Sequence, residues 1–207
     1  MLQLADLSFD IESATLCAAM ADPYWCDTYN SGNGKSLLWA LDVRTVPAEV
    51  DGEKWSPYVY HHGMALSARC WTLLAGQSIS WDAPYDENGE SNGGFYVWEH
   101  GDISFGELKI VNRTGVELDV EWSGVCAVNW NEKHGEKVEF SLKTNVRFRD
   151  INVRGNENDT LVTLGERLSK FLDLGGLVQG DLESNGHSYE SGIAMANCKF
   201  FPAEGAG

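Results

Sequence analysis

The sequence predicts an α+β fold, in which a mainly antiparallel β-sheet forms a meander and one late amphipathic helix packs on it. Apolar and acidic residues alternate strictly over residues 116–122, and a similar alternation recurs over residues 138–143. This period of two is typical of strands with one buried and one exposed face. Between residues 161 and 172, leucine and phenylalanine recur every three or four positions, as they do on the buried stripe of a helix.

The meander is predicted to occupy the middle of the chain, residues 95–154. Residues 103–111 are expected to form the strand that precedes residues 116–122. Residues 112–115 contain the turn-forming residues that would join these two strands. Because consecutive strands joined by short turns pair side by side, we expect one buried face and one charged face.

The pattern of alternation shifts by one residue near the end of the meander. Apolar positions are even-numbered up to Phe148 and odd-numbered from Ile151 onward. A strand keeps one face buried across such a shift only if it contains an extra residue. A β-bulge is therefore expected at Arg149 or Asp150.

Residues 160–174 are expected to form the helix. Asn158, Asp159 or Thr160 can cap its first turn, because their side chains accept hydrogen bonds from free backbone N–H groups. Gly175 can end it in a left-handed conformation. The apolar stripe of this helix should lie against the sheet.

The remaining segments show weaker patterns. Residues 12–20 are rich in Ala, Leu and Met, so a short helix is expected there. Residues 69–74 and 78–81 flank a glycine-containing turn and are expected to form a hairpin. Further strands are expected at residues 2–11, 37–43, 58–62 and 193–201, and a loop at residues 180–186.

Chain length favours a single domain spanning residues 1–207. At 22.9 kDa the chain can bury a substantial core, and its 43% hydrophobic content is that of a globular protein. Residues 86–94 are the most polar and glycine-rich run in the sequence. They are expected to be a long exposed loop or, alternatively, a domain boundary.

The net charge of −16 restricts the partners that this protein can have. Up to Asp102 there are 15 acidic residues against four Lys or Arg (−11), so most of the excess lies in the first half. A negative field repels nucleic acids and anionic membranes and speeds encounter with a basic protein. Solubility alone is the simpler explanation of such a charge.

The five cysteines indicate a reducing compartment. Their number is odd and their spacing is scattered, which favours free and mostly buried thiols over a disulfide framework. The first residues lack the basic and apolar regions of a signal peptide, and no apolar run reaches the roughly 20 residues of a membrane span. We therefore expect a cytoplasmic protein.

No complete catalytic motif is present, so we predict no catalytic residues and no cofactor. Residues 32–36 resemble the end of a phosphate-binding loop, but Tyr29 stands where that motif requires its first glycine. Cys126 could form a dyad with His134, yet it lies in an apolar run and is expected to be a buried, unreactive thiol.

A metal site is the main alternative. His61, His62, His100 and Asp102 provide imidazole and carboxylate groups suited to zinc or a related divalent ion. However, adjacent strand residues point to opposite faces, so only one of His61 and His62 could join His100. Ordinary hydrogen-bonded histidines near strand ends are the simpler interpretation.

A partner-binding surface is the more specific hypothesis. Trp81 and Tyr85 lie beside the acidic residues Asp86, Glu87 and Glu90. Aromatic rings can anchor an interface while carboxylates steer a basic partner toward it. Calcium binding is another possibility, although the loop lacks the ligand spacing of an EF-hand, and a simple solvated loop is a third.

Together these features predict a non-catalytic acidic protein that binds a basic protein, such as an inhibitor or immunity-type protein that neutralises a toxin or enzyme. The alternative is a metal-dependent hydrolase that uses His61 or His62 with His100 and Asp102. A third possibility is an assembly subunit that pairs exposed sheet edges with copies of itself. The oligomeric state is not predicted.

Overall fold

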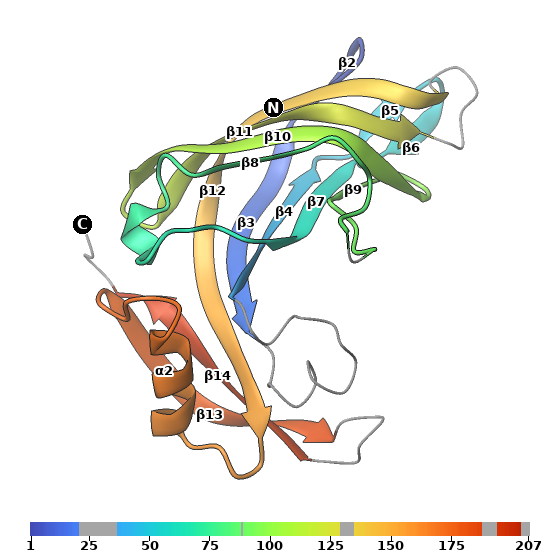
Figure 1. Cartoon of the computed structure of the whole chain (residues 1–207). Coiled ribbons are helices and arrows are strands. Elements are labelled where there is room, and N and C mark those ends of the chain that lie inside the picture. Colours follow the sequence, from blue (N-terminus) through green and yellow to red (C-terminus); the bar gives the residue numbers. More distant parts are fainter. Residues whose placement is uncertain (21–36, 88, 129–134, 188–193, 204–207) are drawn as a thin grey trace.

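The structure is a computed structural model, which describes residues 1–20, 37–87, 89–128, 135–187 and 194–203 (Figure 1). Within these residues the chain is mostly β-sheet, with one α-helix and one short 3₁₀ helix. A mixed, mainly antiparallel sheet contains 12 strands, and β5 and β6 form a separate pair. The elements are β1 (Leu2–Leu4), β2 (Leu7–Phe9), β3 (Ile11–Met20), β4 (Leu38–Thr45), β5 (Ala48–Val50), β6 (Glu53–Trp55), β7 (Tyr58–Met64), η1 (Trp71–Leu73), β8 (Ser78–Trp81), β9 (Gly94–Tyr96), β10 (His100–Thr114), β11 (Glu117–Val128), β12 (Gly135–Asn156), α2 (Leu161–Ser169), β13 (Leu177–His187) and β14 (Ala194–Pro202).

The predicted meander is confirmed: β10, β11 and β12 pair in order and antiparallel. Leu118, Val120 and Trp122 of β11 are buried, while the acidic residues between them point away from the core. Trp122 lies opposite Leu142 of β12, which is also buried. The strands are longer than the alternation indicated, because β10 continues to Thr114 and the turn comes after it.

β12 closes the sheet on itself. Its first part pairs with β11, and its continuation from Arg147 to Val153 pairs in parallel with β3. The pairings run from β12 through β11, β10, β9, β7, β4 and β3 and return to β12 (Figure 1). The side chains that point inward from this closed ring form most of the hydrophobic core.

The prediction of a helix at residues 12–20 is wrong, because this segment is strand β3. Leu16, Ala18 and Met20 are buried at every second position, and β3 lies between β4 and β12. Pairing on both edges satisfies its backbone, and this outweighs the modest helix preference of its alanines.

The predicted β-bulge is confirmed. Phe148 pairs with Leu16 and Ile151 with Ala18, so three steps along β12 match two along β3. Phe148 and Ile151 are both fully buried, and Arg149 within the bulge is exposed. The extra residue therefore keeps the apolar positions of β12 in the core on both sides of the phase change.

β12 continues beyond the ring and pairs with β14, which pairs with β13 (Figure 1). Residues 180–186 thus belong to strand β13, so the loop expected there is wrong. Leu164 and Leu168 of α2 are buried, as the helical pattern predicts. The helix ends at Ser169, five residues before the predicted end.

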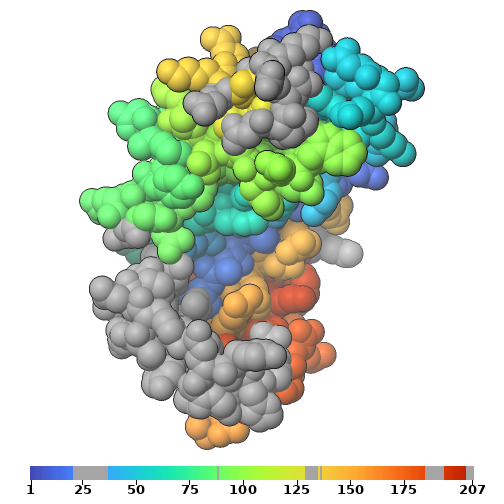
Figure 2. Space-filling model, turned by 90° about the vertical axis from the view of Figure 1, so that its right-hand side faces the viewer, coloured from blue at the N-terminus to red at the C-terminus, as the bar shows by residue number. Residues whose placement is uncertain are grey.

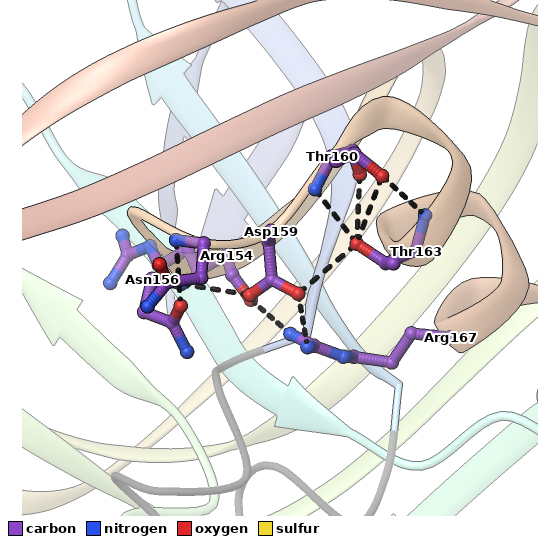
Figure 3. A network of polar contacts seen from close by, with 7 residues as sticks. Arg154, Asn156, Asp159, Thr160, Thr163 and Arg167 are labelled. Carbon is purple, nitrogen blue, oxygen red and sulfur yellow. Dashed lines mark hydrogen bonds and ion pairs between the residues drawn. The ribbon is translucent and has the colours of Figure 1, made fainter.

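The start of α2 is held by a polar network (Figure 3). Thr160 is the N-cap, and its hydroxyl accepts a hydrogen bond from the Thr163 N–H at 3.2 Å. The Asp159 carboxylate accepts the Asn156 N–H at 2.9 Å and a hydrogen bond from Arg167 Nη2 at 2.9 Å. Arg167 Nη1 also donates to the Arg154 carbonyl at 3.0 Å, so the network joins the helix to the end of β12.

The hairpin expected from residues 69–74 and 78–81 is also wrong. Residues 71–73 form the 3₁₀ helix η1, whose Trp71 is buried against Phe148 at a ring-centroid distance of 5.1 Å. Trp71 Nε1 donates to the Gly176 carbonyl at 3.1 Å, which ties η1 to the segment after α2. Only residues 78–81 form a strand, β8, and they pair with β10.

The four described cysteines are free, and Cys126 and Cys198 are buried. Cys126 is buried as expected, and burial raises the pKa of its thiol to about 12, which disfavours the reactive thiolate. Among the described helices, none has the length and apolar character needed to cross a membrane.

Candidate partner-binding surface

We call residues 82–93, which connect β8 to β9, the acidic loop, and this loop lies along one edge of β10. Both β8 and β9 pair with this edge, at residues 106–109 and 100–102 respectively, and the loop connects them. The Asp86 N–H donates to the Glu90 carbonyl at 2.8 Å, and the Asp86 carboxylate accepts the Glu90 N–H at 2.9 Å. Tyr85 and Ser91 form an isolated β-bridge. The loop is thus closed by its own backbone.

Trp81 lies at the base of this loop and points toward the core. Its ring lies over Gly106, which has no side chain. A Cβ atom added at Gly106 would come within 2.2 Å of Trp81 Cζ2. The ring meets His61 edge-on at 4.9 Å, and its Nε1 donates to the Ile103 carbonyl at 3.1 Å. Trp81 therefore supports the loop from beneath.

Tyr85 and the three acidic residues point to solvent. The Tyr85 side chain is 50% exposed, and Asp86, Glu87 and Glu90 are exposed as well. The Tyr85 hydroxyl donates to both carboxylate oxygens of Asp102, at 3.2 and 3.1 Å, and this hydrogen bond raises the pKa of Tyr85. The structure thereby joins Asp102 to the predicted loop.

The histidines do not form one ligand set. His61 points inward, is only 5% exposed and contacts the rings of Trp81 and Trp122. Burial, with a smaller contribution from the neighbouring His62, lowers the pKa of His61 to about 4. His62 lies on the outer face, where its Nε2 donates to Asp42 at 3.1 Å. Among the described residues, no group of three or more potential ligands could hold a metal ion.

The outer face of β4, β7, β9 and β10 carries two cross-strand rows of residues that the sequence did not reveal. The first row is Arg44, Tyr58, Tyr96 and His100, and the second is Asp42, Tyr60, Gly94 and Asp102. We call the rings of Tyr58, Tyr60, His62, Tyr96 and His100 the aromatic platform.

The platform is held together by ring contacts. The Tyr58 and Tyr60 rings stack at 5.0 Å, and Tyr60 lies 5.0 Å from His62. Tyr60 also crosses the bare Gly94, where an added Cβ would come within 2.2 Å of its hydroxyl oxygen. That oxygen lies 3.0 Å from His100 Nδ1, and the Tyr96 ring lies 4.8 Å from His100.

Asp42 fixes the other end of the platform. Its carboxylate accepts hydrogen bonds from the Tyr58 hydroxyl and from His62. Partial burial raises the pKa of Asp42, but the hydrogen bonds from His62 and Tyr58 outweigh it, so the pKa is lowered overall. Asp42 is thus held as a carboxylate.

The sequence contained one signal for this platform. Tyr58, Tyr60 and His62 follow each other at every second position, which places them on the same face of a strand. Tyr96 and His100 could not be joined to them in advance, because the pairing of β7 with β9 is not visible in the pattern. The possible phosphate-loop residues 32–36 lie outside the described residues.

The charge around the loop is one-sided. Residues 70–108 contain no Lys or Arg and seven acidic residues: Asp82, Asp86, Glu87, Glu90, Glu99, Asp102 and Glu107. The neighbouring Lys109 pairs with Glu107 at 2.8 Å. Figure 2 shows part of this region as a continuous outer surface in green. A cation approaching the loop therefore meets a strongly negative local field.

No family model, curated protein or solved structure matches this chain. The function proposed below therefore depends on the geometry and charge of the loop and the aromatic platform.

Proposed function

We propose that this protein binds a basic partner protein through the acidic loop, as an inhibitor or immunity-type protein would. The observation that supports the proposal most strongly is Tyr85, a half-exposed ring that a hydrogen bond to Asp102 orients. It lies in the segment of residues 70–108, which contains seven acidic residues and no Lys or Arg. The loop would be the centre of the interface and the aromatic platform its continuation.

Two physical effects favour such an interface. The Tyr85 ring is already held in one orientation, so little conformational entropy is lost when a partner packs on it. Tyrosine is among the residues that most often contribute large binding energies at interfaces. The carboxylates of Asp86, Glu87 and Glu90 remain solvated and would accelerate the approach of a positively charged surface.

The alternative of a metal-dependent hydrolase has no specific observation in its favour. It would use His61 or His62 with His100 and Asp102, but His61 points into the core while the other three lie on the outer face. His62 and His100 each already have a polar neighbour, Asp42 and Tyr60 respectively. An assembly role through sheet edges likewise has no specific contact to support it.

The experiment is affinity capture from a lysate of the source organism with three forms of the full chain. They are the wild type, the double variant Asp86→Asn/Glu87→Gln, and the control Asp6→Asn/Glu12→Gln. Both variants remove two exposed charges, so they change the net charge equally. Melting temperatures of all three confirm folding.

We expect the wild type and the control to capture a basic protein and the loop variant to capture several times less of it. Tyr85→Ala should reduce capture further, by about 30-fold in affinity if the ring is a central anchor. Equal capture by all forms, or capture of acidic proteins only, would contradict the proposal.

A further inference from the structure

In the first cross-strand row, a cation of this chain already contacts a ring of the aromatic platform. The guanidinium carbon of Arg44 lies 4.4 Å from the centroid of the Tyr58 ring, within the distance of a cation–π contact. Asp42 accepts the Tyr58 hydroxyl and lies close enough for Arg44 to favour its charged form. Ring, carboxylate and guanidinium are thus grouped at the β4 end of the platform.

The β10 end of the platform also has a tyrosine ring and a carboxylate, Tyr96 and Asp102, and among the described residues no Lys or Arg contacts the Tyr96 ring. Tyr96 is the direct neighbour of Tyr58 in the row, and Asp102 lies diagonally across from Tyr96 on β10. Diagonal neighbours on a sheet are about 7–8 Å apart, within reach of one long side chain. Among the described residues, the cation–ring contacts are those of Arg44 with Tyr58 and of Arg113 with Trp71.

We infer that Tyr96 and Asp102 form a subsite for an arginine side chain of the basic partner. This inference depends on the proposed function, since it assigns a residue type to that partner. The guanidinium would stack on the Tyr96 ring and donate to Asp102. Asp102 receives the Tyr85 hydroxyl, and a carboxylate has about four acceptor positions, so it can accept further hydrogen bonds.

Arginine fits this subsite better than lysine for a geometric reason. The guanidinium is planar, stacks on aromatic faces and presents several donors in one plane, whereas the lysine ammonium is a compact and strongly hydrated charge. Residues 70–108 contain no Lys or Arg, so this segment carries a net negative charge. The negative charge therefore favours a cation, and the geometry favours arginine over lysine.

The experiment is an NMR titration of the ¹⁵N-labelled full chain with N-acetyl-arginine N-methylamide, and with the lysine analogue, near pH 8 where an ordinary histidine is neutral. These probes test the subsite without the partner protein. The proteins are the wild type, Tyr96→Leu, and Tyr96→Phe as the conservative variant that keeps the ring. Asp102→Asn tests the carboxylate.

We expect arginine-specific shifts at Tyr96, His100 and Asp102, with arginine bound about three- to fivefold more tightly than lysine. Tyr96→Leu should remove this preference and Tyr96→Phe should retain most of it. Asp102→Asn should weaken both probes. Equal affinity of the two probes for the wild type, or an unchanged preference in Tyr96→Leu, would overturn the inference.

The two proposals can fail separately. If arginine binds at Tyr96 while Asp86→Asn/Glu87→Gln captures as much partner as the wild type, the subsite stands and the proposed function fails. If capture depends on the loop while Tyr96→Leu leaves the arginine preference unchanged, the proposed function stands and the subsite is wrong.

Discussion

At the scale of single residues, the placement of two large rings depends on positions without a side chain. Gly94 lies beneath the Tyr60 ring, as Gly106 lies beneath Trp81. In both cases a large ring can lie flat on the sheet because the strand below it has no Cβ. Glycine therefore determines where the rings of the platform and of the loop base can lie.

Gly94→Ala should displace the Tyr60 ring and separate its hydroxyl from His100. The added Cβ would come within 2.2 Å of the ring, so we expect a loss of roughly 1–3 kcal/mol in the free energy of unfolding. Urea denaturation measures this loss. In a Tyr60→Ala background the same substitution should cost much less, and an equal cost in both backgrounds would show that Tyr60 is not the obstacle.

His61 should make stability depend on pH in one defined window. Its pKa is about 4 in the folded protein and 6.5 for an ordinary exposed histidine, so the unfolded chain binds more protons between these values. Stability should therefore fall as the pH drops from 6.5 to 4, by roughly 2–3 kcal/mol from this residue.

The measurement is urea denaturation at several pH values for the wild type and His61→Phe. The variant should show a shallower loss of stability across the window, whatever its absolute stability. The lowered pKa of Asp42 acts at lower pH, below its ordinary 3.8, and is common to both proteins. Parallel pH profiles for the two proteins would contradict the assignment to His61.

At the scale of elements, alternation was sufficient to predict most strands but not their partners. Strict periods of two in β11 and β12 predicted both strands, and the phase change predicted the bulge between Phe148 and Ile151. The parallel pairing of β3 with β12 has no local signal. Without it, the alanine-rich residues 12–20 had only their weak helix preference as a guide.

The same limit applies to the candidate surface. Acidic composition near Tyr85 could be read from the sequence, because the loop is contiguous. The platform could not, since Tyr58 and Tyr96 become neighbours only through the register of β7 and β9. Trp81 was grouped with the loop by proximity along the chain, but the alternation of β8 turns its ring inward.

α2 supplies the prediction at this scale. The Asp159 and Arg167 side chains are only 10% and 19% exposed and pair at 2.9 Å. Asp159→Ala should leave Arg167 without its carboxylate and remove the acceptor for Asn156, which should cost about 2–4 kcal/mol in unfolding free energy. Thermal denaturation of this variant, with the exposed Glu166→Ala as control, measures the effect. Equal melting temperatures would show that the network is dispensable.

At the scale of the whole molecule, the closed ring separates two kinds of aromatic residue. The rings of Trp39, Trp71, Trp122 and Phe148 are buried and belong to the core. Tyr85 and the aromatic platform lie outside, and the segment around Tyr85 contains no Lys or Arg between residues 70 and 108. The core contains four of the eight tryptophans, Trp39, Trp55, Trp71 and Trp122, and the rings of Tyr85 and the platform are left on the outside for recognition.

The central claim is that this negative surface steers a basic protein to Tyr85. The most direct test is the association rate of the captured partner, measured by stopped flow from low to moderate salt for the wild type and Asp86→Asn/Glu87→Gln. Salt screens charges beyond about 10 Å at 0.1 M, so the wild-type rate should fall steeply with salt and the variant's rate should start lower and fall less. A rate independent of salt, or identical in both proteins, would contradict the claim.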